Sequence, residues 1–232
     1  MILKIGGLEK VSLLDYPGKV SVVLFTYGCN LKCSFCHNPE LVIYPLDSDI
    51  EIKEEEFFHY LKGRKGLIDA VVITGGEPLI WKDIGLLIER IREMDFLIKL
   101  DTNGFFPKEL KQLLKKGLLD YIAMDVKWSK DDYTKFSGDK KAVEKVEKSI
   151  EIIMNSGIDY EFRTTVVKGI HSIEDGAKIA AMIKGAKKYY IQNFRSGKTI
   201  DETLDSSNSF TEKELKQILL GAKKHVENSY IR

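Results

Sequence analysis

The sequence is poor in cysteine, nearly balanced in charge, and has no long apolar run. Its three cysteines all lie between residues 29 and 36, which argues against a disulfide scaffold. The net charge of +1 offers no basic surface of the kind that binds nucleic acid. No apolar stretch approaches the roughly 20 residues that a membrane helix needs. The first ten residues lack the apolar core of a signal peptide, so we expect a cytoplasmic protein.

The remaining composition is that of an ordinary globular protein, with 44% hydrophobic and 31% charged residues. The length of 232 residues is enough to bury a sizeable core and suits one domain. No internal repeat stands out, and no linker divides the chain. We therefore expect a single domain over residues 1–232.

After a short N-terminal segment (residues 2–5 and 11–12), short apolar segments alternate with longer segments in which apolar residues recur at helical spacing. Six are short and apolar, as buried strands are: 20–26, 70–74, 96–100, 119–124, 160–167 and 188–192. Between them, apolar residues recur at helical spacing in 51–62, 84–91, 107–114, 143–153 and 173–183, and Thr211 with Glu214 predicts a capping box for a last helix. This order predicts a parallel sheet with right-handed crossovers. Eight units close a full barrel, so six predict an α/β fold with an open parallel sheet, a partial (β/α)6 barrel.

The three cysteines, Cys29, Cys33 and Cys36, have the spacing C-x3-C-x2-C on one loop after the first strand. Three thiolates from one loop can hold one face of an iron–sulfur cube. A cube has four irons, so one iron is left open, and an open coordination position is where a metal does chemistry. The alternative is a zinc site that uses these cysteines with His37. Zinc sites usually pair two C-x2-C arms, and the sequence has no second arm.

This loop resembles that of the radical S-adenosylmethionine (SAM) enzymes, whose aromatic residue before the last cysteine is matched by Phe35. The resemblance implies a [4Fe–4S] cluster whose open iron binds the amino and carboxylate groups of SAM. It also implies one-electron cleavage of SAM to methionine and a 5′-deoxyadenosyl radical. We expect His37 to hydrogen-bond the cluster loop or SAM. We expect His59, His171 and His225 to be surface residues.

The second strand is followed by the sequence Gly75-Gly76-Glu77-Pro78. Two glycines let the main chain approach a ligand closely. The resemblance assigns this G-G-E segment to the amino group of SAM, with which a carboxylate makes a charge-assisted hydrogen bond. The alternative is a tight turn in which Pro78 opens a helix.

Polar residues also follow the later strands, at the edge where parallel sheets bind ligands. Asp101 and the pair Asp125 and Lys127 suit the ribose and the carboxylate of SAM, and the two carboxylates could share a monovalent cation. The alternatives are turn chemistry for Asp101 and a plain ion pair for Asp125 and Lys127. Arg163 could reach the SAM carboxylate, and Asn193 or Arg195 could touch the nucleoside. Besides the three cysteines as cluster ligands, the candidate cofactor-binding residues are Phe35, His37, Gly75, Gly76, Glu77, Asp101, Asp125, Val126, Lys127, Arg163 and Asn193.

Four segments are similar to those of glycyl-radical-enzyme activases: L-L-D-Y-P-G (13–18), C-H-N (36–38), D-T-N-G (101–104) and D-V-K (125–127). Among these the chain most resembles the activating proteins of anaerobic ribonucleoside-triphosphate reductase, followed by pyruvate formate-lyase activating enzymes. Tyr16 stands where the latter usually have glycine. The resemblance implies a glycyl radical enzyme as protein substrate and a flavodoxin or ferredoxin as electron donor. We expect no catalytic residue beyond the cluster and cofactor ligands.

A carbon-centred radical must be shielded from water, and only the polar loop 196–209 is left to cover the barrel mouth. The substrate protein could supply the cover by inserting its glycine loop. The alternatives are a radical SAM enzyme that acts on a small molecule, as the 7-carboxy-7-deazaguanine synthases do, and a non-enzymatic zinc-binding module.

Overall fold

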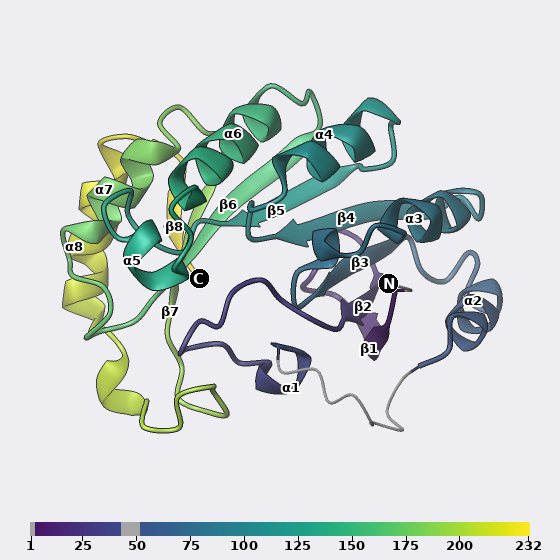
Figure 1. The fold of residues 1–232 in the computed structure, drawn as a ribbon, viewed down its shortest axis with the longest axis horizontal. Helices are drawn as coiled ribbons and strands as arrows, with labels where there is room; N and C mark the ends of the chain where they lie inside the picture. The colour runs from purple at the N-terminus through teal and green to yellow at the C-terminus, as the bar shows by residue number, and fades with distance from the viewer. Residues whose placement is uncertain (1–2, 43–51) are drawn as a thin grey trace. The chain divides into compact units, whose positions relative to one another are not determined.

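The computed structural model describes residues 3–42 and 52–232 (Figure 1). The strands are β1 (Ile5–Ser12), β2 (Ser21–Thr26), β3 (Ala70–Gly75), β4 (Leu97–Thr102), β5 (Tyr121–Asp125), β6 (Asp159–Val166), β7 (Tyr189–Asn193) and β8 (Ser229–Ile231). The α-helices are α1 (Pro39–Val42), α2 (Glu54–Lys62), α3 (Ile84–Arg92), α4 (Pro107–Lys115), α5 (Tyr133–Ser137), α6 (Ala142–Met154), α7 (Asp175–Met182) and α8 (Glu212–Lys223). The 3-10 helices are η1 (Pro78–Ile80) and η2 (Ser206–Asn208). Residues 2 and 51, which bound two of the expected segments, lie outside the described residues.

The strands form an eight-stranded sheet in chain order, from β1 to β8. β1 pairs antiparallel with β2, whereas β2 to β4 and β6 to β8 pair in parallel. The expected α/β class with a mainly parallel sheet is therefore confirmed. The six expected strands are β2 to β7, so the expected count is two lower than the number of strands in residues 3–42 and 52–232. β1 contains two glycines, which weaken a strand pattern, and β8 has only three residues and so shows no periodicity.

The chain divides into two compact units. The first unit comprises Met1–Asn30, Glu40–Thr102 and Lys108–Ile122, and the second comprises Leu31–Pro39, Asn103–Pro107 and Ala123–Arg232. Strands β1 to β4 belong to the first unit and β6 to β8 to the second, and β5 is divided between the units after Ile122. No helix within residues 3–42 and 52–232 is long and apolar enough to cross a membrane.

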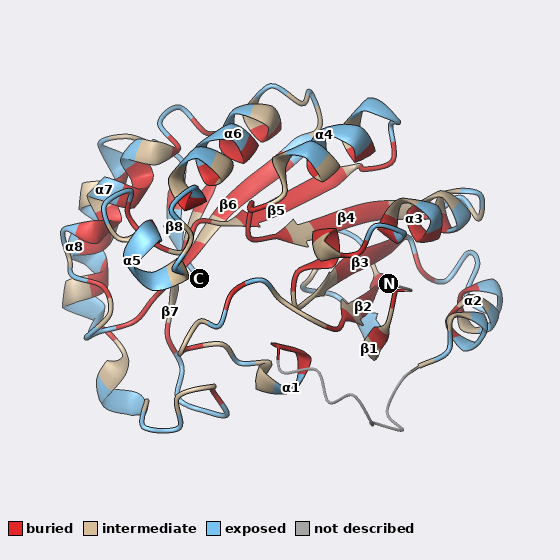
Figure 2. Ribbon diagram, viewed as in Figure 1, coloured by how far each residue is buried: buried red, intermediate tan, exposed pale blue. Residues whose placement is uncertain are grey.

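In the first unit, β2 and β3 are buried along most of their length (Figure 2). β-branched residues on both faces of β3 fit a parallel strand that is covered on both sides. One face packs around Tyr16, from the L-L-D-Y-P-G segment, against Val23, Val72 and Tyr121. The ring centroids of Tyr16 and Tyr121 are 5.6 Å apart. The turn between β1 and β2 therefore supplies a core residue.

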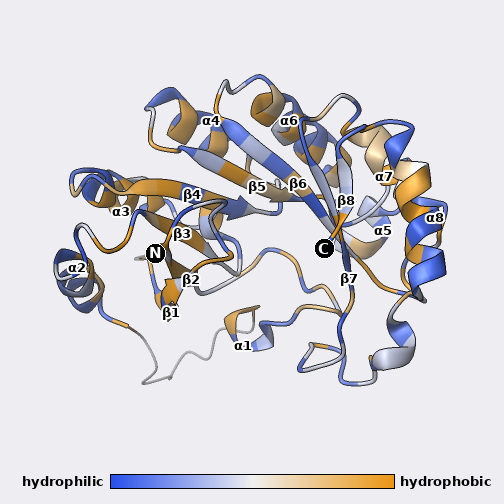
Figure 3. Ribbon diagram, turned by 180° about the vertical axis from the view of Figure 1, so that it is seen from behind, coloured by the Kyte–Doolittle hydropathy of each residue, from blue (hydrophilic) through white to orange (hydrophobic). Residues whose placement is uncertain are grey.

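In the second unit, helices α7 and α8 lie side by side (Figure 1). Gly176 of α7 permits this close approach because it has no Cβ. A Cβ at this position would lie only 2.4 Å from a methyl carbon of Ile218 in α8. Along α8, hydrophobic segments (orange) alternate with hydrophilic ones (blue) in Figure 3. Helix α8 begins with the expected capping box, in which Thr211 and Glu214 bond each other's main chain.

Candidate cofactor site

The G-G-E turn of the first unit begins at Gly75, the last residue of β3, and is bonded to the chain that leaves β2. Gly76 N–H donates to the Thr26 carbonyl at 2.9 Å, and Glu77 N–H donates to the Gly28 carbonyl at 2.8 Å. Gly75 has φ +112°, a conformation that side chains rarely adopt. A Cβ on Gly76 would lie 1.9 Å from the Gly28 carbonyl oxygen. Both glycines are therefore required by the close approach of two main-chain segments, the second of which leads directly into the first cysteine.

The Glu77 carboxylate is fully buried at this turn. Its Oε1 accepts from Leu79 N–H at 3.1 Å and from the Thr102 hydroxyl at 2.8 Å. The first of these bonds caps η1, which begins at Pro78. The interpretation as a turn in which the proline opens a helix is confirmed. The same two bonds fix the position of the Glu77 carboxylate. Binding of the SAM amino group by Glu77 is compatible with this position and stays a prediction.

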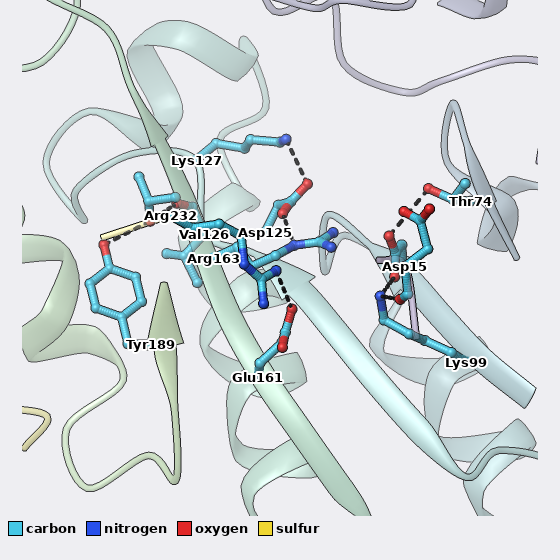
Figure 4. A network of polar contacts seen from close by, with 12 residues as sticks. Asp15, Thr74, Lys99, Asp125, Val126, Lys127, Glu161, Arg163, Tyr189 and Arg232 are labelled. Atoms are coloured by element: carbon cyan, nitrogen blue, oxygen red, sulfur yellow. Dashed lines mark hydrogen bonds and ion pairs between the residues drawn. The ribbon is translucent and has the colours of Figure 1, made fainter. Parts of the chain in front are cut away.

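Asp101, at the carboxyl end of β4, lies beside a lysine that the sequence interpretation missed. The Lys99 ammonium nitrogen is 3.2 Å from Asp101 Oδ1, and the Thr74 hydroxyl donates to Asp101 Oδ2 at 3.4 Å (Figure 4). The sequence could have indicated this pair. Lys99 lies inside the apolar segment 96–100, and residues two positions apart on a strand point to the same face, so Lys99 and Asp101 could have been predicted as neighbours.

The cysteine turn of the second unit contains Cys33 and Cys36, whose main chains are joined by a 3.0 Å bond from Cys36 N–H to the Cys33 carbonyl. Asp201 N–H donates to the Ser34 carbonyl at 2.9 Å. The polar loop 196–209 is therefore attached to the cysteine turn. All three cysteines of the chain are partly exposed, and Cys29 belongs to the first unit.

Aromatic rings surround this turn. Phe35 is buried, and its ring meets the rings of Trp128 and His171 edge-on at 6.4 and 6.0 Å. His37 stacks on Phe194 with the ring centroids 5.5 Å apart. Phe35 thus packs the turn against the core of the second unit, and His37 rests on an aromatic face.

The D-V-K segment places two cations around one carboxylate (Figure 4). Asp125 is bonded by Lys127 Nζ at 2.9 Å and by Arg163 Nε at 2.9 Å. Burial alone would raise the pKa of the Asp125 carboxyl, but Arg163 and Lys127 hold that pKa well below its usual range. The ion-pair interpretation is confirmed. Together the three side chains have one net positive charge, which suits an anionic group of a ligand.

The Cys33 thiol lies in the field of this ion pair. Burial raises the pKa of Cys33 to about 11, and the Lys127 ammonium partly offsets that rise. Iron binds the thiolate, so binding must release the proton, and a neighbouring ammonium makes this easier. No three His, Cys, Asp or Glu side chains of the described residues are already grouped as a metal site. The donor chemistry fits an iron–sulfur cluster, and the full ligand set stays a prediction.

Main-chain bonds hold the D-V-K segment in place. Val126 is fully buried; its N–H donates to the Arg163 carbonyl, and its own carbonyl accepts from the Thr164 hydroxyl at 2.7 Å. The Lys127 N–H donates to the Tyr133 hydroxyl at 2.9 Å. Val126 has no polar side chain, so it would contact a cofactor only because the chain places it next to the cofactor.

The expectation that His171 is a surface residue is wrong. His171 is only 6% exposed, and its two ring nitrogens bond the Val167 N–H at 3.0 Å and the Lys127 carbonyl at 2.9 Å. The N–H at Val167 needs an acceptor and the carbonyl of Lys127 needs a donor, so the neutral ring has its proton on Nε2. His171 therefore fixes the residue that pairs with Asp125.

His171 is expected to stay neutral in the folded protein below pH 6.5. Burial lowers the pKa of His171 below its usual 6.5. The unfolded chain then binds more protons, so the stability due to this ring is present above pH 6.5 and falls as pH drops. A two-dimensional NMR titration of the imidazole nitrogens, recorded on the folded and on the urea-unfolded protein, checks this. Protonation of His171 in the folded protein at the same pH as in the unfolded chain, or at a higher pH, would contradict it.

The side-chain amide of Asn193, which we expected to contact the nucleoside of SAM, is bonded to the main chain of Phe210. Its Nδ2 donates to the Phe210 carbonyl at 2.9 Å, and its Oδ1 accepts from the Phe210 N–H at 3.0 Å. These two bonds anchor the segment before α8. A ligand role for this residue stays a prediction.

Comparison with known proteins identifies the family. A family model described as the radical SAM superfamily matches residues 23–183. A protein of Methanocaldococcus jannaschii, named as a glycyl-radical enzyme activating enzyme, is 35% identical over 233 residues, covering 98% of this chain and 95% of that one. The pyruvate formate-lyase-activating enzyme of Clostridium pasteurianum is 28% identical over 192 residues, covering 79% of this chain and 77% of that one.

The fold is also that of a solved structure. Streptococcus suis SuiB bound to S-adenosylmethionine superposes with a TM-score of 0.65 at 17% identity, over 88% of this chain and 48% of that chain. The chain thus spans about half the length of SuiB. From the family model and the nearly full-length relative, we conclude that the chain belongs to the radical SAM superfamily.

Proposed function

We propose that this radical SAM enzyme is an activase that generates a glycyl radical on a partner enzyme, and that the partner is an anaerobic ribonucleoside-triphosphate reductase. The observation that supports the activase most is the 35% identity to a protein so named, because the match runs over nearly the whole of both chains. The choice of reductase rests on the resemblance of segments such as L-L-D-Y-P-G and on Tyr16. We further propose that the two units act as one domain and that the protein is cytoplasmic.

In this proposal Cys29, Cys33 and Cys36 hold a [4Fe–4S] cluster, and the G-G-E turn and the D-V-K segment hold SAM. When bound, the cluster supplies one electron to SAM, and SAM supplies the radical that removes hydrogen from carbon. A flavodoxin or a ferredoxin delivers the electron.

The chain's own residues supply position, charge and exclusion of water. Gly76 would let the main chain come close to the amino group of SAM, and the Glu77 carboxylate, which is buried, would receive that group. The net positive charge of Asp125, Lys127 and Arg163 would attract the SAM carboxylate. Phe35 closes the side of the cysteine turn with an apolar ring.

The test uses anaerobically reconstituted protein, SAM, dithionite and an anaerobic ribonucleoside-triphosphate reductase. We expect the electron paramagnetic resonance signal of a glycyl radical on the reductase, together with about one 5′-deoxyadenosine released per radical. A reductase whose radical glycine is replaced by alanine is the matched control and should stay without signal. SAM cleavage without a radical on any glycyl radical enzyme, accompanied by a modified small molecule, would contradict the activase and favour the small-molecule alternative.

A further inference from the structure

Trp128, the residue that follows the D-V-K segment, has a buried hydrogen-bond donor without an acceptor. The residue is 3% exposed, and its indole Nε1–H bonds no group of the described residues. An indole nitrogen can only donate, so the partner that is missing is an acceptor. A buried donor left unpaired is costly, and native structures rarely keep one unless a bound molecule or ion satisfies it.

Three aromatic rings of the second unit pack on Trp128. Its ring stacks on that of Phe136 with the centroids 5.4 Å apart. It meets the rings of Tyr133 and Phe35 edge-on at 5.6 and 6.4 Å. An aromatic ring is at most a weak acceptor, and the Tyr133 hydroxyl already accepts the Lys127 N–H at 2.9 Å. These neighbours fill space around the indole without offering its N–H a strong acceptor.

Phe35 connects Trp128 to the cysteine turn of the same unit, because it lies between Cys33 and Cys36 in the chain. Cys33 is also an electrostatic neighbour of this aromatic group. Burial raises the pKa of the Tyr133 hydroxyl above its usual range, and negative charge on Cys33 adds to that rise. The acceptors that a loaded cysteine turn brings to this place are the thiolate and sulfide sulfurs of a cluster.

An interior water is the other common partner of a buried donor. Such a water is held by about two to four polar groups, whereas the three side chains that pack on Trp128 present rings. Cluster sulfurs accept hydrogen bonds, and these bonds are among the factors that set the reduction potential of a cluster. A donor stabilises the reduced cluster, which is the more negative form, and so raises the potential.

We propose that Trp128 Nε1–H donates a hydrogen bond to a sulfur of the cluster that Cys33 and Cys36 help to hold, and that this bond raises the reduction potential of the cluster. The inference rests on the cluster of the proposed function, and it holds whichever partner enzyme receives the radical. It gives the buried N–H the acceptor that the aromatic packing lacks.

The first arm of the test looks for the indole nitrogen beside the reduced cluster. The protein is produced with tryptophan labelled with nitrogen-15 in the indole ring, reconstituted anaerobically without SAM, and reduced chemically. We expect electron nuclear double resonance to show a nitrogen-15 coupling to the cluster. Trp81 is the control, because it is the second tryptophan of the chain and its Nε1–H already donates to the Tyr27 carbonyl at 2.7 Å. The coupling should persist in Trp81→Phe and vanish in Trp128→Phe.

The second arm measures the reduction potential by redox titration of the same SAM-free protein. Trp128→Phe should lower the potential by about 59 mV, which is a tenfold smaller ratio of reduced to oxidised cluster at a given potential. Trp81→Phe should keep the wild-type value. Benzothienylalanine at position 128 has sulfur in place of the N–H and nearly the size of tryptophan, so it should lower the potential as Trp128→Phe does. It separates the hydrogen bond from packing and replaces Trp128→Phe in both arms should that variant fail to fold.

The outcomes separate this inference from the proposed function. A loaded cluster without coupling to Trp128, or with a potential that is indifferent to loss of the N–H, overturns the hydrogen bond and leaves the activase untouched. A coupling that appears only after SAM is added assigns the donor to SAM and also overturns it. A coupled cluster in a protein that makes no glycyl radical supports the bond and contradicts the activase. A wild type that takes up no cluster rejects both.

Discussion

Replacing Cys33 with alanine should abolish cluster loading and SAM cleavage while the protein stays folded. Iron content should fall from about four atoms per chain to a trace, because two thiolates cannot hold a cube that three would hold. Cys33 lies in a turn, partly exposed, so the lost packing is small. The measurements are iron and sulfide content, the brown absorption of the cluster, and 5′-deoxyadenosine released under dithionite, with circular dichroism to confirm the fold.

His37→Ala is the matched control for Cys33→Ala. A zinc site made of three cysteines and His37 would lose its metal in either variant, whereas the cluster needs only the cysteines. His37, which is next to Cys36, stacks on Phe194, so replacing the His37 side chain removes one ring contact. We expect His37→Ala to keep its iron. Loss of the metal from His37→Ala, or SAM cleavage retained in a folded Cys33→Ala, would contradict the cluster hypothesis.

Gly76→Ala should destabilise the first unit by about 3 kcal/mol or more and remove SAM binding. Overpacking a core typically costs about 1–3 kcal/mol when side chains can move aside. Here the clashing atom is the Gly28 carbonyl oxygen, 1.9 Å from the added Cβ, and it belongs to the main chain. Bonds from Gly76 N–H and Glu77 N–H tie the two segments together, so relief of the clash must break them. The free energy of unfolding in urea measures the loss.

Gly85→Ala is the control for Gly76→Ala. Gly85 lies in α3 of the same unit, and its added Cβ would lie 3.6 Å from Leu113 Cδ2, an ordinary contact. Alanine is favoured over glycine in a helix by about 1 kcal/mol, so this variant should be as stable as wild type or more stable. A Gly76→Ala protein that unfolds at the wild-type urea concentration and binds SAM normally would show that the turn does not need the close approach.

Most of the fold could be predicted from local patterns. The continuous β-branched run of β3 and the helical spacing in α3 are patterns of residues that are close in sequence. They therefore predict a strand and a helix without any knowledge of the tertiary structure. The same is true of the capping box at Thr211 and of the proline that begins α4. β1 and β8 were missed as strands because glycines and shortness remove the local signal.

The family of this protein follows from its residues alone, because the cysteine spacing and the strand-end motifs are short and contiguous. Which distant groups stabilise those motifs depends on the three-dimensional fold. Lys99 reaches the Asp15 carbonyl across 84 residues, and His171 bonds the Lys127 carbonyl across 44 residues. Asn193 turned out to bond the main chain of Phe210. Such contacts depend on which side chains the packed strands and helices bring together, and neither periodicity nor spacing encodes them.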